Sequence, residues 1–262
     1  MTVKIIVCVK TNMDLQMVRI KNREPVLEAI PYKCGDLEKN ALEAAMKIKE
    51  SGVDCIVVAL TVAEANTRIR ETIKEALAIG ADEAAIVADP ALAATDQAAV
   101  AVAIAKAVEK IGDCDLLLFG EGSTDNYSGQ VGSRVAELLG WPQIGYAKKV
   151  EVVDGGVRAE RSMDNMIETL QAPLPAVVTV VSEINEPRIP SLMNIMKAGK
   201  KPVAEFALAD LGLDSTALLP QKAVLSNLAE EQDRKHIMFE GDAAAQAAGL
   251  VDALVKEGVL GR

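Results

Sequence analysis

The stretch DCDLLLFGEGSTDNYSGQVGSRVAELLG, residues 113–140, joins three kinds of sequence in a fixed order. DLLLF at 115–119 is continuously apolar, which is typical of a strand buried in a parallel sheet. The loop at 120–133 is small, polar and acidic, and VAELLG at 135–140 predicts a helix. A buried strand that leads through a polar loop into a helix is the repeating unit of α/β proteins.

The same alternation extends over roughly the first 145 residues. Three more strands are predicted, at 4–10, 54–61 and 84–88. Three more helices are predicted, at 36–51, from the second strand to about Ile79, and at 95–111, where Thr95 is the expected N-cap. We therefore expect an α/β fold with a Rossmann-like, doubly wound, mostly parallel sheet and right-handed crossovers.

The pattern changes after Trp141-Pro142. Alternating segments at 148–153, 157–163 and 167–172, separated by turn residues, predict an antiparallel extension. LPAVVTVV at 174–181 is again continuously apolar, and we expect it to re-enter the parallel sheet. The chain is therefore divided into an α/β domain at 1–205 and a C-terminal arm at 206–262, which ends in an amphipathic helix.

Composition limits the classes of function. Half of the residues are apolar but only 3% are aromatic, so the core is expected to consist of Ala, Val, Ile and Leu. The formal net charge of −10 argues against nucleic acid as a partner, because binding to the phosphate backbone needs a basic surface. No apolar run approaches the roughly 20 residues of a membrane span. MTVKIIVCVK lacks the long apolar stretch of a signal peptide, and we expect a cytoplasmic protein.

The sequence shows no catalytic or metal-binding pattern. Its four cysteines form no CxxC pair, and it has a single histidine, His236. We expect buried, inert thiols rather than a zinc site or a disulfide framework. No nucleophile, acid and base are grouped as an enzyme would need, so the protein is not expected to be an enzyme.

The loop at 120–133 is interpreted as a phosphate site. In a doubly wound sheet, ligands bind beyond the carboxyl ends of the strands where strand order reverses, here expected between the first and fourth strands. Helix N–H groups attract phosphate oxygens, Gly129 and Gly132 allow close approach, and Ser123 and Ser128 offer hydroxyls. Neither GxGxxG nor GxxxxGK[ST] is present, which favours a monophosphate or pyrophosphate. The alternative is a capped turn that binds nothing.

INEPRIPSLMNIMKAGKKP, here named the recognition loop (residues 184–202), mixes apolar, sulfur and cationic side chains. The residues that define it are Arg188, Leu192, Met193, Ile195, Met196 and Lys197. Apolar groups flanked by cations in a proline-broken segment indicate a docking surface. The alternative is a short helix packed on its own domain with a solvated basic end.

Together these segments resemble the beta subunit of electron-transfer flavoproteins over roughly residues 1–210. The most specific match is NEPRIPSLMNIMKAGKKP. RAERSMDNMIETLQAPLPAVVTV, ALEAAMKIKE and VKIIVCVK also correspond to the family. The resemblance implies a heterodimeric electron carrier, in which an alpha subunit holds most contacts to FAD and the beta subunit closes one side of its pocket. The C-terminal arm would contact the alpha subunit.

The resemblance also implies sites. The beta subunit binds either AMP or a second FAD, and Tyr127 either stacks on adenine or fills the space of a second isoalloxazine. The implied contacts are Cys8, Gly35, Asp36, Leu37, Glu38, Val62, Asp125, Asn126, Tyr127, Ser128, Gly129, Gln130, Val131, Gly132, Ser133 and Arg134. Leu192 stands where the family's anchoring leucine inserts into a flavin-dependent, acyl-CoA-type dehydrogenase.

Two other functional classes share the expected fold. A stand-alone nucleotide-binding module of the universal-stress type would explain the phosphate loop, but it gives the recognition loop and the arm no purpose. An adenylating or nucleotide-hydrolysing enzyme usually carries an SGGxDS-type loop after the first strand, and VKTNMDLQM does not supply one.

Overall fold

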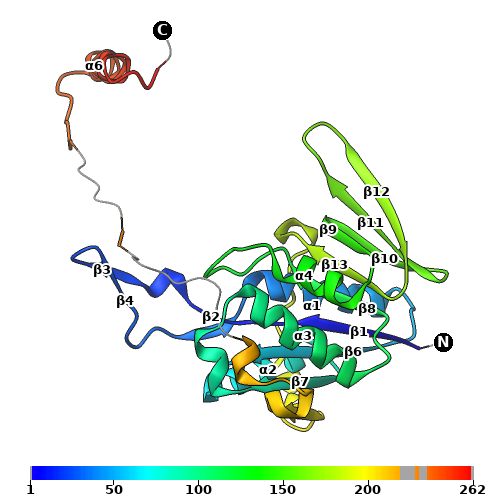
Figure 1. The fold of residues 1–262 in the computed structure, drawn as a ribbon. Helices are drawn as coiled ribbons and strands as arrows, with labels where there is room; N and C mark the ends of the chain where they lie inside the picture. The colour runs from blue at the N-terminus through cyan, green and yellow to red at the C-terminus, as the bar shows by residue number, and fades with distance from the viewer. Residues whose placement is uncertain (1, 219–227, 230–234, 261–262) are drawn as a thin grey trace. The chain divides into compact units, whose positions relative to one another are not determined.

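The computed structural model describes residues 2–218, 228–229 and 235–260 (Figure 1). The chain forms two compact units. The first contains Met1–Arg19 and Val26–Ser226, and the second contains Ile20–Pro25 and Asn227–Arg262. The domain boundary expected at residue 205 falls inside strand β14 (Val203–Phe206), which belongs to the first unit.

A seven-stranded sheet forms the centre of the first unit. In spatial order its strands are β14, β7 (Glu83–Ala88), β6 (Cys55–Ala63), β1 (Val3–Cys8), β8 (Leu116–Gly120), β13 (Ala176–Val180) and β9 (Gln143–Ala147). Every neighbouring pair is parallel. The chain adds β6 and β7 on one side of β1, and β8 and β13 on the other. Strand order therefore reverses between β1 and β8, and the predictions of a doubly wound sheet and of the return at 174–181 are confirmed.

Helices cover both faces of this sheet. On one face α1 (Asp36–Glu50) and α2 (Thr67–Ile79) pack on a core that includes Ile5, Val57 and Leu118. On the other, α3 (Gln97–Ile111) and α4 (Val131–Leu139) pack on a core that includes Ile6 and Leu117. Successive strand residues thus enter opposite cores, and because both faces are buried, the strands are continuously apolar.

The start of α3 differs from the expectation by one residue. The Asp96 carboxylate accepts hydrogen bonds from the backbone N–H groups of Ala98 (3.0 Å) and Ala99 (3.1 Å), so Asp96 is the N-cap. The prediction of Thr95 was wrong, since its hydroxyl instead donates to the Leu92 carbonyl at 2.9 Å. A carboxylate is well suited to this position because it satisfies two N–H groups at the positive end of the helix dipole.

The antiparallel extension contains β10 (Lys149–Val153), β11 (Gly156–Ser162) and β12 (Ile167–Pro173), as predicted. It projects from the central sheet in Figure 1. Val157, Ala159 and Ala172 are buried and join its base to the core shared with α1 and α2. Two short strand pairs complete the sheets. β2 (Thr11–Met13) pairs with β5 (Tyr32–Cys34) in antiparallel direction, and β3 (Arg19–Lys21) pairs with β4 (Glu24–Val26).

The remaining elements are short except for the last helix. They are η1 (Leu15–Met17), η2 (Pro90–Ala94), η3 (Ser182–Ile184), α5 (Leu192–Ala198), η4 (Leu208–Leu211), η5 (Ser215–Leu218) and α6 (Ala243–Lys256). Leu208, Leu211 and Leu218 are buried in the core beside α3. In the second unit α6 begins after its N-cap Asp242 and has no buried residue. Within the described residues, no helix has both the length and the apolar character required to cross a membrane.

Candidate functional site: a cavity where strand order reverses

A cavity of about 380 Å³ lies in the first unit at the carboxyl ends of the central strands. β1 contributes Cys8, β6 contributes Val62 and β8 contributes Gly120, while the starts of α3 and α4 contribute Gln97 and Val131. This is the place where strand order reverses, and the volume is within the range of about 300–1,000 Å³ found for small-molecule sites.

Most of the predicted nucleotide contacts line this cavity. They are Cys8, Glu38, Val62, Asn126, Ser128, Gly129, Gln130, Val131 and Gly132. They come from four separate parts of the sequence, which the fold brings together. The remaining predicted contacts, Gly35, Asp36, Leu37, Asp125, Tyr127, Ser133 and Arg134, do not line it.

Two of these remaining residues, Gly35 and Leu37, pack behind the residues that line the cavity. A Cβ at Gly35 would overlap the Glu38 carboxylate and the Asn12 amide, so glycine is needed here to make room for Glu38. Leu37 packs against the end of β8, where a Cβ at Gly120 would lie only 2.8 Å from the Leu37 Cβ. These contacts set the distance between α1 and the sheet.

Asp36, Ser133 and Arg134 each make a hydrogen bond with a neighbouring side chain. Asp36 is exposed and accepts from Lys33 at 3.2 Å. The Ser133 hydroxyl accepts from Gln143 at 2.9 Å, and Arg134 donates to Gln130 Oε1 at 3.0 Å. Tyr127 is exposed and has a positive φ of 45°.

The helix starts at the cavity differ in their caps. The N-terminus of α3 is already occupied by the Asp96 carboxylate. α4 begins after Gln130, which makes no side-chain capping hydrogen bond. The first N–H groups of a helix need a partner, and the dipole makes an anion the favoured one. The start of α4 is therefore suited to bind a phosphate.

The two glycines of the loop have different roles. Gly129 has a φ of +62°, a conformation that glycine adopts without strain, and a Cβ there would meet no atom closer than 3.5 Å. A Cβ at Gly132 would lie 2.7 Å from Thr179 Cγ2, so Gly132 allows α4 to pack closely on β13. Gly129 thus shapes the loop, and Gly132 positions the helix that follows it.

Lys10 and Asp125 join the turn after β1 to the loop after β8. The Lys10 ammonium donates to both Asp125 carboxylate oxygens at 2.7 Å, and the Ser123 hydroxyl donates to Asp125 at 2.6 Å. Partial burial would raise the pKa of Asp125, but these hydrogen bonds outweigh it and lower that pKa. The pair holds the two walls of the switch point together and leaves Lys10 on the cavity surface.

Glu38 is a buried acid in the cavity wall, with 4% of its surface exposed. Burial raises its pKa to about 7, against the opposing effects of its hydrogen bonds and of Lys10. Three further acids line the cavity, Glu64, Asp96 and Glu121. The walls are therefore acidic overall, and the favourable sites for a phosphate are the start of α4 and Lys10.

Several polar lining residues had not been assigned to a site by the sequence. They are Lys10, Thr11, Asn66, Thr95, Asp96, Glu121 and Thr179. Lys10 and Thr11 come just after Val9, the first residue beyond β1, and Glu121 directly follows β8. The rule that ligands lie beyond strand ends provides the signal that would have found these three.

The four cysteines are free and buried. Burial raises the pKa of each thiol, which favours the unreactive protonated form. Among the described residues, no group of three or more His, Cys, Asp or Glu side chains is placed to hold a metal ion.

The recognition loop contains a short helix with an exposed apolar surface. Helix α5 begins after Ser191, whose hydroxyl accepts from the Asn194 N–H at 3.2 Å. Exposed fractions are 75% for Leu192, 63% for Met193 and 72% for Met196, and Ile195 is also exposed. Ala198 is buried, and α5 contacts α2. The loop is thus a helix packed on its own unit that keeps its large apolar side chains in solvent.

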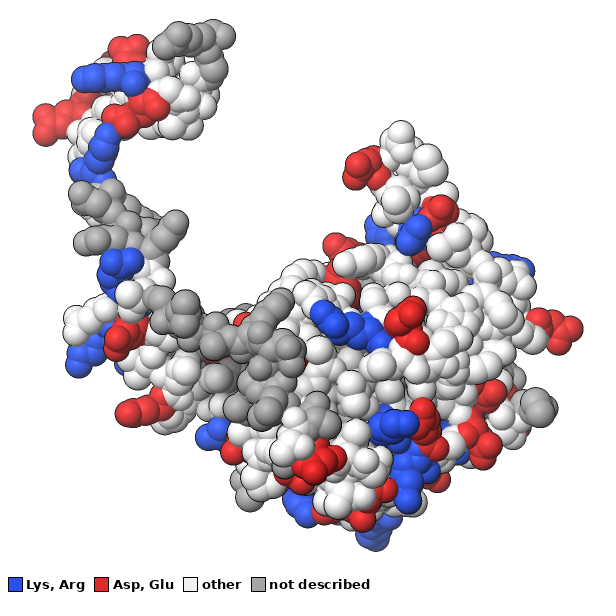
Figure 2. Space-filling view, viewed as in Figure 1, with Lys and Arg blue, Asp and Glu red and all other residues white. Residues whose placement is uncertain are grey.

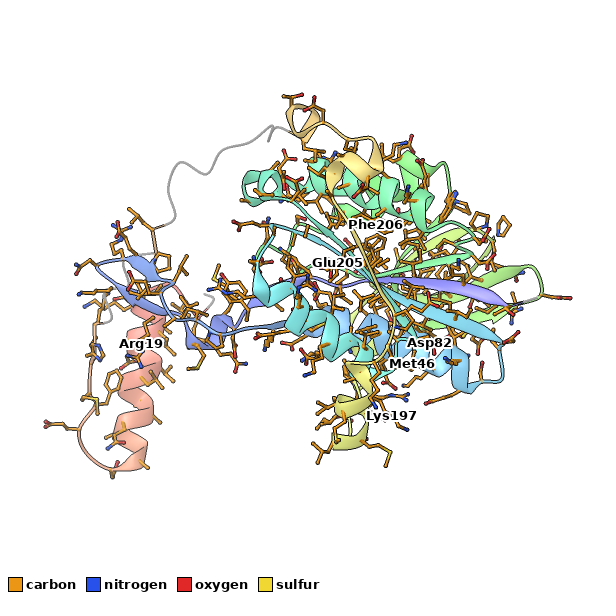
Figure 3. The ribbon with its side chains drawn as sticks, turned by 90° about the horizontal axis from the view of Figure 1, so that it is seen from below. Arg19, Met46, Asp82, Lys197, Glu205 and Phe206 are labelled. Atoms are coloured by element: carbon orange, nitrogen blue, oxygen red, sulfur yellow. The ribbon has the colours of Figure 1, made fainter. Side chains whose placement is uncertain are left out.

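The cations of this loop have separate roles. Arg188 donates to Glu43 Oε2 at 2.7 Å and to Glu50 Oε1 at 2.6 Å, both on α1. Lys201 donates to the Leu77 carbonyl of α2 at 2.8 Å. Lys197 is exposed on α5, and its side chain extends away from the sheet in Figure 3. Arg188 and Lys201 therefore fix the loop to the helices, whereas Lys197 faces solvent.

The visible face of the first unit carries mixed charge. Figure 2 shows Lys and Arg side chains interspersed with Asp and Glu over this face.

A comparison with known protein families gives one match. The family described as "Electron transfer flavoprotein domain" matches residues 26–211, more than two thirds of the chain.

Proposed function

Because the chain belongs to the electron transfer flavoprotein family, we propose that it is the beta-type subunit of a heterodimeric electron carrier and binds an adenine nucleotide in the cavity. The observation that carries the proposal is the start of α4. This helix lacks a side-chain cap and opens into a cavity where strand order reverses. A nucleotide phosphate would satisfy its N–H groups.

The residues present fit an adenine nucleotide. The first N–H groups of α4, the Ser128 hydroxyl and Lys10 would hold the phosphate. The apolar walls from β1, β6 and α3, including Val62 and Val100, would receive the base. The ligand is either AMP or the ADP part of a second FAD.

The redox chemistry belongs to the flavin. An FAD shared with the alpha subunit supplies electron transfer when bound, and this chain orients and encloses it. The chain itself makes and breaks no bonds in this role, and is a carrier subunit rather than an enzyme. It would pass electrons between a flavin-dependent, acyl-CoA-type dehydrogenase and a downstream acceptor.

The recognition loop supports the beta-type assignment. Leu192 is three-quarters exposed at the first position of α5, and Met193, Ile195 and Met196 follow it. Buried apolar anchors contribute most of the binding energy of an interface, and rim charges such as Lys197 orient the partner. We assign this helix to the docking of the dehydrogenase.

The deciding experiment is the nucleotide content of the complex. The chain is co-expressed with an alpha-type subunit, and the purified complex is denatured and its nucleotides are quantified by chromatography. One FAD and one AMP per heterodimer support a one-flavin carrier, and two FAD support a second flavin in the cavity. A homodimer that holds a nucleotide but no flavin would overturn the proposal in favour of a stand-alone nucleotide-binding module.

A further inference from the structure

Glu38 is fixed in the wall of the cavity by close packing. It belongs to the first turn of α1 and is 4% exposed. Its carboxylate occupies the space that any side chain at Gly35 would need, and it lies beside the Asn12 amide. The local sequence thus makes room for an acid at a place where an ionised acid is costly.

Glu38 makes no ion pair within the described residues. The cation that acts on it, Lys10, is held by both oxygens of Asp125 at 2.7 Å. The Asn12 Nδ2 donates to the carboxylate at 3.4 and 3.5 Å, which is at the long limit for a hydrogen bond. The Asn12 Oδ1 is buried and has no hydrogen-bond partner among the residues that the structure describes. The backbone N–H of Glu38 and the start of α1 also favour a negative charge, but burial outweighs all of these effects, so the pKa of Glu38 is raised.

The other charges near Glu38 are mostly negative or neutral. Asp125 comes from the loop after β8, and the buried, neutral Cys34 thiol comes from β5. Glu64, Asp96 and Glu121 line the same cavity. A bound phosphate adds further negative charge and excludes water, and both effects disfavour the ionised carboxylate.

We propose that Glu38 takes up a proton when the cavity binds its phosphate-bearing ligand, so that the nucleotide anion and one proton bind together. The proton comes from the solvent, is added to a carboxylate oxygen of Glu38, and returns to the solvent when the nucleotide leaves. This inference rests on the proposed function, because it assumes an adenine nucleotide in the cavity. Nucleotide affinity is then set by pH through one residue of α1.

The direction of the pH effect follows from the pKa. Because the pKa of Glu38 is about 7, the acid is largely protonated below that pH and must gain a proton above it. Affinity is then expected to fall by roughly tenfold to twentyfold between pH 7 and 8.5, since one linked proton changes affinity by up to about tenfold per pH unit. A ligand phosphate with a pKa of about 6 is already ionised between pH 7 and 8.5, so it adds little to the change of affinity with pH.

Calorimetric titration with AMP tests the proposal. The full chain, in the form in which it is isolated and after removal of bound nucleotide, is titrated at pH 7, 7.5, 8 and 8.5 in buffers of different ionisation enthalpy. The expected result is an affinity that falls with pH and an uptake that approaches one proton per AMP at pH 8. In Glu38→Gln, a neutral mimic of the protonated acid, affinity is expected to be constant and proton uptake absent.

Glu64→Gln is the matched control, because it removes the same charge from an exposed position on the cavity. It is expected to change affinity by a similar factor at every pH and to keep the proton uptake of the parent. Equal pH dependence in Glu38→Gln and the parent would overturn the proposal, as would a parent affinity that is constant with pH. In both cases AMP still binds, and the proposed function stands.

A complex that binds no AMP and releases no adenine nucleotide on denaturation would overturn both proposals. If Glu38→Gln does not fold, infrared difference spectra of the parent at pH 8 provide the second measurement. A protonated-carboxyl band that appears on AMP addition supports proton uptake, and its absence contradicts it.

Discussion

Arg188 and Glu43 form a partly buried ion pair across 145 residues of sequence. Nε of Arg188 lies 2.7 Å from Oε2 of Glu43, and Nη2 of Arg188 lies 3.0 Å from Oε1 of Glu43. The Glu43 side chain is only 6% exposed, whereas that of Arg188 is 33% exposed. The same helix, α1, contributes Glu38 to the cavity, so one rigid element contacts both the nucleotide site and the recognition loop.

Arg188→Ala is expected to lower the free energy of unfolding by about 2–4 kcal/mol, because it leaves the Glu43 carboxylate buried without a cation. Denaturant unfolding measures the loss. The double variant Arg188→Ala, Glu43→Gln is expected to recover part of it, since no buried charge remains. A double variant less stable than Arg188→Ala would contradict this explanation.

The buried part of the fold could be predicted from the sequence because both faces of its strands are covered. β1, β6, β7, β8 and β13 are apolar runs for that reason. The edge strands have no such continuous apolar run in the sequence. In β14, where Figure 3 labels Glu205, the residues Val203, Ala204 and Glu205 are exposed. The Glu205 carboxylate accepts a hydrogen bond from Arg70 at 2.8 Å. An edge strand only four residues long, with few buried positions, is indistinguishable from a loop by its pattern.

The site could be located from the sequence but not completed. The loop at 120–133 lies beside the cavity as predicted, because strand order fixes where strand ends meet. Lys10 and Glu121 were missed, since a charged residue after a strand has the same pattern whether it faces solvent or a cavity. Gly35 was assigned to the nucleotide, but its space is taken by Glu38, a contact that depends on side-chain packing.

Gly132→Ala is expected to destabilise the protein by about 1–3 kcal/mol, because its Cβ would lie 2.7 Å from Thr179 Cγ2. Thr179→Ser removes that methyl group and keeps the hydroxyl that accepts from the Tyr146 N–H at 3.0 Å. The double variant should therefore be more stable than Gly132→Ala alone. Thermal unfolding of the three variants checks this, and strictly additive losses would rule out the proposed contact.

Leu192→Ala is expected to slow electron exchange with the dehydrogenase and to leave stability within about 0.5 kcal/mol of the parent, because the side chain is 75% exposed. Steady-state kinetics with varied carrier concentration and the flavin content of the complex provide the two measurements. Leu138→Ala, which truncates a 51% exposed leucine on α4, is the control. Equal loss of flavin and of electron transfer in Leu192→Ala would contradict a docking role.

Glu38→Gln is expected to change the pH dependence of stability. The pKa of Glu38 is raised from 4.5 to about 7 in the folded chain, so folding favours the protonated acid. The stability that the protonated Glu38 contributes is present below pH 4.5 and is lost as the pH rises through 7. Above pH 7 the neutral variant should be more stable than the parent by about 3 kcal/mol, and the difference should vanish near pH 4.5. Unfolding by urea across this range measures it, and a constant difference would contradict the shifted pKa.

Gln130→Glu tests whether the start of α4 holds the phosphate. The substitution keeps the shape of the side chain and the oxygen that accepts from Arg134, but adds a negative charge at the helix N-terminus. The charge is favourable for the helix dipole, so the nucleotide-free protein should be unchanged or more stable by up to about 1 kcal/mol. It repels a phosphate at the same N–H groups, and AMP affinity should fall by roughly five- to thirtyfold, or about 1–2 kcal/mol.

Gln171→Glu is the control for this prediction, since it makes the same change of net charge at an exposed position of β12. AMP titration at pH 7 and at two salt concentrations compares the two variants. The loss in Gln130→Glu should persist at high salt, because a charge in contact with the phosphate is screened less than a distant one. If both variants bind AMP as the parent does, the phosphate does not bind at the start of α4. The start of α3 cannot serve as the phosphate site instead, because the Asp96 carboxylate already occupies its N–H groups.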